Sequence, residues 1–403
     1  MGIPDEGSGS WIHDGGSTIR DQGFGIRDSG SEDPSDRYNW RVDIRSGTIA
    51  ALYVFDVAEQ IDLARVRERL GGGAAARLTT KAAQPASLQY QVPPLVIDGE
   101  AAGFAQIEGF HARLKFFDYG VVSLALVQPF SGSWDDLLAA SQRYIENPRL
   151  EDAAEQAVRQ TVERCGTTMT RPRASYLSED YLILAVHELD TPLDADALLA
   201  ARGAQVAQML RGETLPLSAQ EQEEVLKNRL SYLSNDLVVP TWNAAFVYDT
   251  EAGAAAATEL FEFTNSQLLE FRYYDAMLDA EMARLYPELQ RASWWHNLLG
   301  GGAVRAANQV HSLYIDINDI TDRTDNALKI VGDIYAARVL ALAAARLGLA
   351  RWRQSVEEKL GTLDTIYRFA VEQVSISRGQ FLEIAIILIL VFELILFFLG
   401  IMK

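Results

Sequence analysis

Apolar and polar positions follow a mixed pattern between residues 41 and 215. Apolar runs typical of strands alternate there with amphipathic stretches typical of helices. The predicted strands are residues 49–56, 109–117, 121–128 and 181–188, and the predicted helices are residues 63–70, 134–146, 151–165 and 194–210. This mixture predicts an α+β domain with a small, mostly antiparallel sheet.

Short polar motifs predict where some of these elements begin and turn. The tripeptide at 118–120 is Asp-Tyr-Gly and lies between two strand-like runs, which predicts a hairpin. Ser133 precedes a helical pattern and is a candidate cap. Ser218 is followed three residues later by Glu221, which matches a capping box.

Residues 216–347 have a mainly helical pattern. A strand-like segment covers residues 237–248, and two longer helices are predicted at about 254–289 and 308–347. A glycine run at 300–302 separates the two helices. We therefore expect a mainly helical second domain.

Residues 348–383, together with Ile384 directly after them, carry a mostly apolar row of side chains at alternating spacings of four and three. The positions are Val356, Leu360, Leu363, Tyr367, Ala370, Val374, Ser377, Phe381 and Ile384. This is the seam of a coiled coil, and it predicts a long helical stalk. The seam packs either on a preceding helix of the same chain or on a second copy, and the pattern fits both.

The most apolar stretch of the chain is Ile384–Met402. It holds 19 residues with one charge, Glu393. A helix of this length is about 28 Å long, close to the thickness of the hydrocarbon core. We expect one C-terminal transmembrane helix with Glu393 near its middle. A carboxyl there is expected to be protonated or paired with the same residue of another chain.

The first forty residues are rich in Gly, Ser and Asp and lack an apolar core. This composition predicts a disordered acidic tail and resembles neither a secretory signal nor a transit peptide. We therefore expect a single-pass, tail-anchored protein of a bacterial inner membrane with the bulk of the chain in the cytoplasm.

Composition narrows the classes of function. The 403 residues include 36 Lys and Arg against 55 Asp and Glu, a formal charge of −19. Such acidity argues against general nucleic-acid binding, and no DNA partner is expected. Residues 338–380 are locally positive, with seven basic and four acidic residues. This stretch is either an ordinary solvated helix surface or a contact for anionic lipid or an RNA-rich partner.

Motifs of known chemistry are missing from the chain. There is no P-loop, no strand followed by GxGxxG, no GxSxG and no HExxH. The five histidines do not pair at helical spacing, and Cys165 is the single cysteine. We predict no catalytic, cofactor-binding or metal-binding residues, no cofactor and no enzymatic activity.

The segment LLEFRYYD at 268–275 combines charge with aromatic rings within a predicted helix. Arg272 can reach Asp275 or a carboxylate of a partner helix, and Tyr273 and Tyr274 lie on adjoining faces. We expect these four residues to serve packing or interaction. With Leu360, Leu363 and Glu393 they complete the candidate residues.

Four segments resemble the required-for-meiotic-nuclear-division family. They are residues 268–286, 236–250 and 322–338 and the terminal helix that enters the apolar run. The resemblance implies an α+β N-terminal part, a coiled-coil C-terminal part and a C-terminal membrane helix. It also implies oligomers and, for mitochondrial members, support of translation near the membrane.

The sequence thus predicts a tail-anchored scaffold or tether, homo-oligomeric, in contact with membrane lipid and with a ribosome or another RNA-rich assembly. The alternative is an enzyme or ligand-binding sensor with its site in the α+β domain. An enzyme needs a cleft with convergent polar groups, whereas a tether needs a broad contact surface.

Overall fold

A computed structural model describes residues 43–70, 92–104, 106–291 and 334–398, with the isolated positions 315, 318 and 322. All of them belong to one unit, Arg41–Lys403. The predicted tail at 1–40 and much of the predicted helix 308–347 lie outside the described residues. So do the side chains of the seam positions Tyr367, Ala370, Val374, Ser377 and Phe381.

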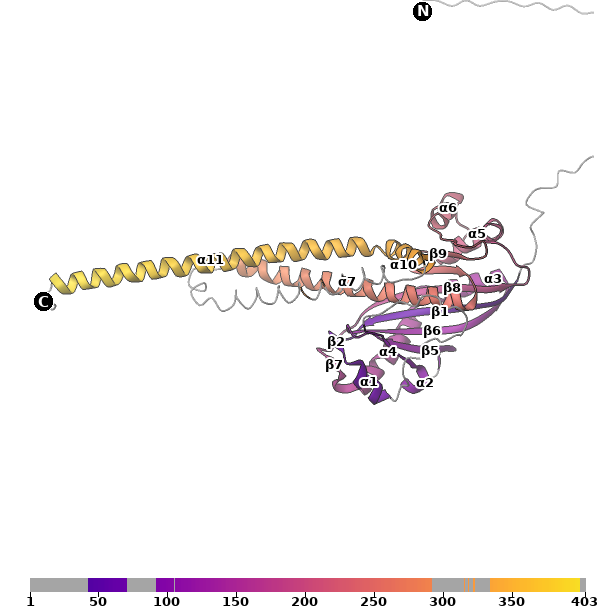
Figure 1. The fold of residues 1–403 in the computed structure, drawn as a ribbon, viewed down its shortest axis with the longest axis horizontal. Helices are drawn as coiled ribbons and strands as arrows, with labels where there is room; N and C mark the ends of the chain where they lie inside the picture. The colour runs from indigo at the N-terminus through magenta and orange to yellow at the C-terminus, as the bar shows by residue number, and fades with distance from the viewer. Residues whose placement is uncertain are drawn as a thin grey trace, which may run out of the picture. The chain divides into compact units, whose positions relative to one another are not determined.

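The core of the fold is an eight-stranded sheet (Figure 1). Its strands run in the order β3-β5-β6-β1-β8-β10-β9, with β4 also paired to β5, and β10 on β8 is the parallel pair among antiparallel ones. The bounds are β1 Ile44–Asp56, β3 Leu95–Asp98, β4 Gln106–Ile107, β5 Phe110–Phe116, β6 Val121–Gly132, β8 Leu177–Leu189, β9 Leu237–Pro240 and β10 Ala244–Tyr248; β2 Gln60–Ile61 pairs with β7 Met169–Thr170. The predicted α+β class with a mostly antiparallel sheet is confirmed.

The sheet is larger than predicted because it continues past residue 215. β9 and β10 come from the stretch that was expected to form a mainly helical domain, and both join the sheet beside β8. The predicted domain boundary between residues 215 and 216 therefore lies between strands of the same sheet.

The helices match the predicted ones closely in the first half of the chain. Their bounds are α1 Leu63–Leu70, α2 Gly99–Ala102, α3 Trp134–Tyr144, α4 Pro148–Cys165, α5 Ala195–Arg211, α6 Ala219–Leu226, α7 Glu251–Arg291, α10 Ile334–Arg346 and α11 Leu349–Phe398, with a short 3₁₀ helix at Gly166–Thr168. Ser133 caps α3 in a capping box with Asp136, and the side chain of Ser218 accepts a hydrogen bond from the backbone of Glu221. Gly120 at φ +93° makes the predicted hairpin turn.

The two faces of the sheet carry separate cores. On one face, strand residues such as Tyr53, Phe55 and Leu184 form a cluster with apolar side chains of α1, α3, α4, α5 and α6. On the other face, Leu52 and Ile183 form a cluster with α7, α10 and α11. Because side chains alternate along a strand and both faces are covered, β1 is apolar at every position over residues 49–55, and β8 over residues 181–186.

Helix α7 crosses the second face and continues past it. It contacts β1 and β8, and its 41 residues span about 60 Å. A 13-residue strand spans about 43 Å. Figure 1 shows α11 lying alongside α7, and the two helices are in contact. The chain reverses between α10 and α11 at Gly348, which has φ +69°.

No helix among the described residues has the combination of length and apolar character that crossing a membrane requires. The predicted transmembrane helix at 384–402 stays a prediction, and its last residues, 399–402, lie outside the described ones.

Candidate functional site

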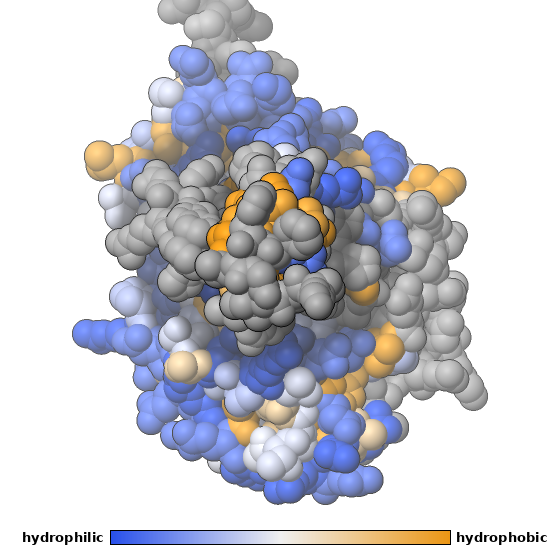
Figure 2. Space-filling model, turned by 90° about the vertical axis from the view of Figure 1, so that its left-hand side faces the viewer, coloured by the Kyte–Doolittle hydropathy of each residue, from blue (hydrophilic) through white to orange (hydrophobic). Residues whose placement is uncertain are grey.

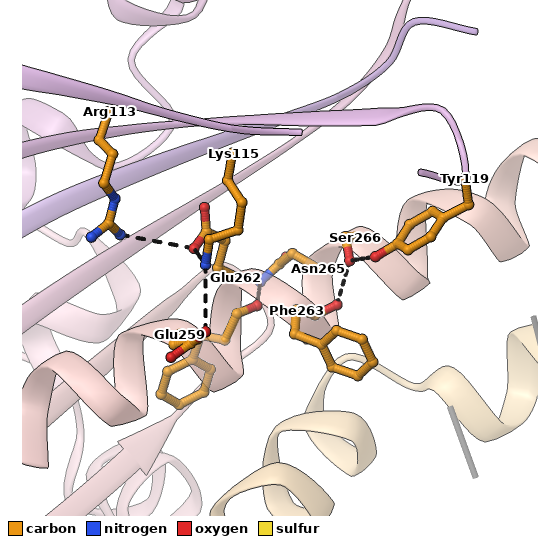
Figure 3. A network of polar contacts seen from close by, with 9 residues as sticks. Arg113, Lys115, Tyr119, Glu259, Glu262, Phe263, Asn265 and Ser266 are labelled. Carbon is orange, nitrogen blue, oxygen red and sulfur yellow. Dashed lines mark hydrogen bonds and ion pairs between the residues drawn. The ribbon is translucent and has the colours of Figure 1, made fainter. Parts of the chain in front are cut away.

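The most polar part of the second face is the junction between the sheet and α7. Lys115 of β5 points from the sheet towards the helix, and its Nζ lies 2.5 Å from Oε2 of Glu262 (Figure 3). Arg113 Nη2 lies 3.9 Å from the same oxygen, and Glu259 Oε1 lies 3.9 Å from the lysine. The Lys115 and Glu262 side chains are 5% and 0% exposed, so this ion pair is inside the protein.

Burial and charge act against each other at Glu262. Burial by itself would raise the pKa of its carboxyl, but the nearby Lys115 and Arg113 outweigh it, and the pKa is lowered below its usual value. The carboxylate is therefore ionised at neutral pH. A buried ion pair of this kind adds little net stability, but losing one partner leaves an uncompensated charge and costs about 3–5 kcal/mol.

Two tyrosines extend the junction along α7. The hydroxyl oxygen of Tyr119 lies 2.8 Å from Oγ of Ser266, and both groups are buried. The ring of Tyr181 stacks on Phe261 at 5.3 Å between centroids, and its hydroxyl donates to the backbone oxygen of Ala244 at 2.9 Å. These contacts set the position of α7 along the strands through specific partners.

A second group of charges surrounds α7 where β1 ends and β8 begins. Arg173, in the loop 171–176 between β7 and β8, donates from Nε to Asp56 at 3.0 Å. Its guanidinium carbon also lies 3.9 Å from the centre of the Tyr273 ring. The arginine thus joins a strand to the helix through one charged contact and one cation–π contact.

The carboxyl of Asp56 is buried and only partly hydrogen-bonded. The residue is 1% exposed, and its Oδ1 is buried without a hydrogen-bond partner. Burial raises its pKa to about 6, although the charge and the hydrogen bond of Arg173 act in the opposite direction. The group therefore titrates near neutral pH.

The predicted candidates in α7 contact different parts of the fold. Arg272, which could reach Asp275 or a carboxylate of a partner helix, forms an ion pair with Glu179 of β8. The reason is tertiary: packing of α7 on the sheet brings the start of β8 next to Arg272. Tyr273 is half-buried under Arg173, and Tyr274 is buried in the core between sheet and helices.

Asp275 connects α7 to α11. Its carboxylate accepts a hydrogen bond from Ser355 Oγ at 2.7 Å and lies 2.8 Å from Lys359 Nζ. The same amine lies 2.7 Å from Asp279. Partial burial would lower the pKa of Lys359, but the two carboxylates prevail and raise it.

The described seam positions that precede residue 367 pack within the chain. Leu360 and Leu363 are 3% and 0% exposed and share a core cluster with Phe271 and Leu278 of α7. For these positions the seam belongs to the contact between α11 and α7 of one chain.

The C-terminal end of α11 is apolar as well, but its side chains are exposed. Of the exposed large apolar side chains in the described residues, ten lie between 384 and 395: Ile384, Ile386, Ile387, Leu388, Ile389, Leu390, Val391, Phe392, Leu394 and Ile395. Glu393 is exposed among them. Figure 2 views the molecule towards this end and shows hydrophobic residues gathered there.

Sequence reasoning missed the residues that form the two junctions, namely Lys115, Glu262, Asp56 and Arg173. A signal was present for the first pair, because a lone lysine stands in the apolar strand run at 114–117 and a lone glutamate stands between Phe261 and Phe263. Single charges of opposite sign inside apolar segments suggest a buried pair. No local signal exists for Asp56 and Arg173.

Among the residues that the structure describes, no group of three or more His, Cys, Asp or Glu side chains is suited to hold a metal ion. Burial raises the pKa of the Cys165 thiol to about 11, which disfavours the reactive thiolate.

Comparison with known proteins identifies the family. Residues 46–255 match the family described as "Uncharacterized protein MJ0711, N-terminal domain". The chain belongs to this family. The matched range contains the whole sheet except the first two residues of β1, and it ends where α7 begins.

One relative is the uncharacterized protein MJ0711 of Methanocaldococcus jannaschii. It is 22% identical over 218 residues, which cover 54% of this chain and 65% of the relative. The match thus spans less than two thirds of the relative's length. No solved structure matches the chain. The resemblance to the required-for-meiotic-nuclear-division family stays a prediction.

Proposed function

We propose that the chain is a membrane-anchored scaffold without catalytic activity. In this proposal the sheet offers the contact surface, and the α7–α11 pair connects it to a single-pass C-terminal anchor. The setting is a bacterial inner membrane with the bulk of the chain in the cytoplasm, and the protein forms homo-oligomers.

One observation carries the proposal: the two ends of α11 differ in how deeply their apolar side chains are buried. The helix begins with Val356, Leu360 and Leu363 buried against α7 and ends with a row of exposed apolar side chains. Exposed apolar surface costs about 25 cal/mol per Å² in water, so a long helical end covered with it favours a nonaqueous environment. The apolar run of the sequence continues to Met402, beyond the last described side chain.

Membrane extraction tests the anchor. Intact protein should stay with membranes after carbonate treatment, and deletion of residues 381–403 should release it. The matched control removes only Lys403, which keeps the whole apolar run, and it should stay in the membrane fraction. Resistance of the 381–403 deletion to extraction, or access of external protease to the intact protein, contradicts the proposal.

Support of translation rests on the family resemblance and on the positive stretch 338–380. Part of that charge is already engaged, because Arg353 pairs with Glu357, Arg368 with Asp364 and Lys359 with Asp275. Ribosomes should co-sediment with membranes that contain the protein at low salt and dissociate as salt rises. Equal sedimentation with membranes that lack the protein would remove this role.

A sensor in the α+β domain is the second candidate. The observation that favours it is the buried carboxyl of Asp56, which titrates near neutral pH at the contact between the sheet and α7. Groups with strongly shifted pKa values often mark functional positions.

A further inference from the structure

Exposed apolar side chains gather where the sheet ends at β9. Outside residues 384–395, seven large apolar side chains are exposed in the described part of the chain, and four of them lie here: Tyr232, Leu233, Trp242 and Ile334. The first two precede β9, and Trp242 lies in the turn between β9 and β10. Ile334 is the first residue of α10, which contacts β9 (Figure 1). We call this surface the β9–α10 corner.

Local contacts hold part of the corner in place. The two carboxylate oxygens of Asp236 accept hydrogen bonds from the backbone N–H groups of Tyr232, at 2.6 Å, and Leu233, at 2.7 Å. The ring of Tyr232 also lies 5.9 Å from the ring of Tyr335 on α10, measured between centroids. A surface that is already ordered loses less conformational entropy when a partner binds.

The outward side of α10 forms a stripe that fits a second helix. Its exposed residues Ile334, Arg338, Ala341 and Ala345 follow one another at spacings of four, three and four, so they lie on one face of the helix. The two alanines are small, and helix axes come closer together where the side chains at their contact are small.

The corner also carries arginines without a carboxylate partner. Within the part of the chain that the structure describes, no ion pair is formed by Arg338, Arg346 or Arg351. The Nε atom of Arg346 is buried without a hydrogen-bond partner. Because a guanidinium binds a carboxylate through two parallel hydrogen bonds, these arginines suit a partner with acidic side chains.

Arg346 lies on the side of α10 that faces the turn with Trp242. Burial raises the pKa of the Tyr181 hydroxyl well above its usual value, and Arg346 is close enough to oppose this rise. The same hydroxyl donates to the backbone oxygens of Thr241 and Ala244, which belong to the turn. Positive charge and an exposed indole therefore occur in one neighbourhood.

We infer that the β9–α10 corner binds an acidic amphipathic helix of a partner protein. The apolar side of that helix covers Leu233, Trp242 and Ile334. Its carboxylates pair with Arg338 and Arg346. The inference rests on the proposed scaffold role, for which it names the class of partner, and it does not use the membrane anchor.

Two other occupants fit the corner less well. A second copy of this chain in a two-fold interface would bring the arginines of both copies together. A single-stranded RNA would use the arginines and Trp242 but would leave Leu233 and Ile334 uncovered.

A peptide of stated chemistry tests the inference. The probe is a fluorescent helical peptide of about 18 residues, long enough to span about 27 Å, with leucine on one face and glutamate on the other. The control peptide carries glutamine in place of glutamate. Fluorescence anisotropy measures binding to the full chain in nanodiscs of neutral phosphatidylcholine, with empty nanodiscs as the blank.

The acidity of the protein makes this comparison selective. The formal charge of −19 opposes an acidic peptide, so a preference for glutamate requires a local positive surface. At physiological ionic strength charges act over about 8 Å, so the nearby arginines outweigh distant carboxylates. We expect the glutamate peptide to bind about tenfold more tightly than the glutamine peptide.

Matched variants locate the binding surface. Arg338→Ala combined with Arg346→Ala should weaken binding of the glutamate peptide about tenfold and remove its advantage, whereas Arg67→Ala on α1 should not. Leu233→Ala should weaken binding of both peptides about fivefold, whereas Leu215→Ala, at another exposed leucine, should leave it unchanged. Each replaced side chain is at least partly exposed, so the variants should keep the fold.

A glutamate peptide that binds no more tightly than the glutamine peptide overturns the inference, and so does binding that the double arginine variant leaves intact. A single-stranded oligouridine that binds through the same two arginines and displaces the peptide also overturns it and assigns the surface to RNA. These results leave the carbonate-extraction test of the anchor unaffected, so failure of this inference and failure of the proposed function are distinguishable.

Discussion

The first half of α7 and the last part of α11 reverse the usual relation between polarity and burial. The α7 half contains buried Glu262, Asn265, Ser266 and Glu270 within the protein. The α11 end exposes ten large apolar side chains. The stability of each helix segment therefore depends more on its surroundings than on its intrinsic helix propensity.

The two helix segments differ in the kind of contact that stabilises them. The polar groups of α7 find specific partners on the sheet, such as Lys115 for Glu262 and Tyr119 for Ser266. In the proposed anchor, the apolar side chains at the end of α11 would need only a medium without water. Specific partners fix the position of α7, whereas such a medium would fix only the depth of α11.

The largest test of this comparison removes one member of the buried pair. Glu262→Ala should lower the free energy of unfolding by about 3–5 kcal/mol, because Lys115 is left charged and unpaired inside the protein. Urea denaturation followed by circular dichroism measures it. Lys115→Met combined with Glu262→Met should recover much of the loss, and a double variant as unstable as the single one would contradict the assignment.

The next test asks whether the seam of α11 belongs to one chain. Leu363→Ala should cost about 2–5 kcal/mol, since the side chain is fully buried against α7. The mass of the particle in detergent should not change. Thr362→Ala is the exposed neighbour and serves as control. A change to monomers without loss of stability would show that the seam joins separate chains.

The pH dependence of stability tests the second junction. The pKa of Asp56 is about 6 in the folded protein against an ordinary 3.8, so the folded state binds this proton more tightly. The stability contributed by this group is therefore fully present below pH 3.8 and is lost as pH rises through 6, a total of about 3 kcal/mol.

Denaturation of wild type and Asp56→Asn at pH 5 and pH 7.5 isolates this contribution. The wild type should lose roughly half of that total relative to the variant between the two values. A constant difference between the two proteins would mean that Asp56 has an ordinary pKa.

The smallest expected effect concerns Glu393. Hydrogen bonds between membrane helices are worth about 0.6 kcal/mol on average, so Glu393→Gln should keep any helix association and Glu393→Leu should weaken it slightly. Crosslinking between anchor helices compares the three proteins. Equal yields would mean that this carboxyl has no role in assembly.

The sequence by itself determined the local elements. The strand predicted at 49–56 lies inside β1, the helix predicted at 63–70 is α1, and Ser133 caps α3 as expected. These features depend on side-chain period and on hydrogen bonds between residues three apart, so a short window contains all the information.

Only the tertiary structure decided the contacts that connect the sheet to α7 and to the loop 171–176. Lys115 and Glu262 are 147 residues apart, and Arg173 and Asp56 are 117 apart. The parallel pairing of β10 with β8 likewise extends the sheet past its predicted end. The sequence separations within such pairs follow no periodic pattern. Their members meet because the strands and α7 bury two apolar faces at once, and charges left inside must then pair with whatever the packing brings near.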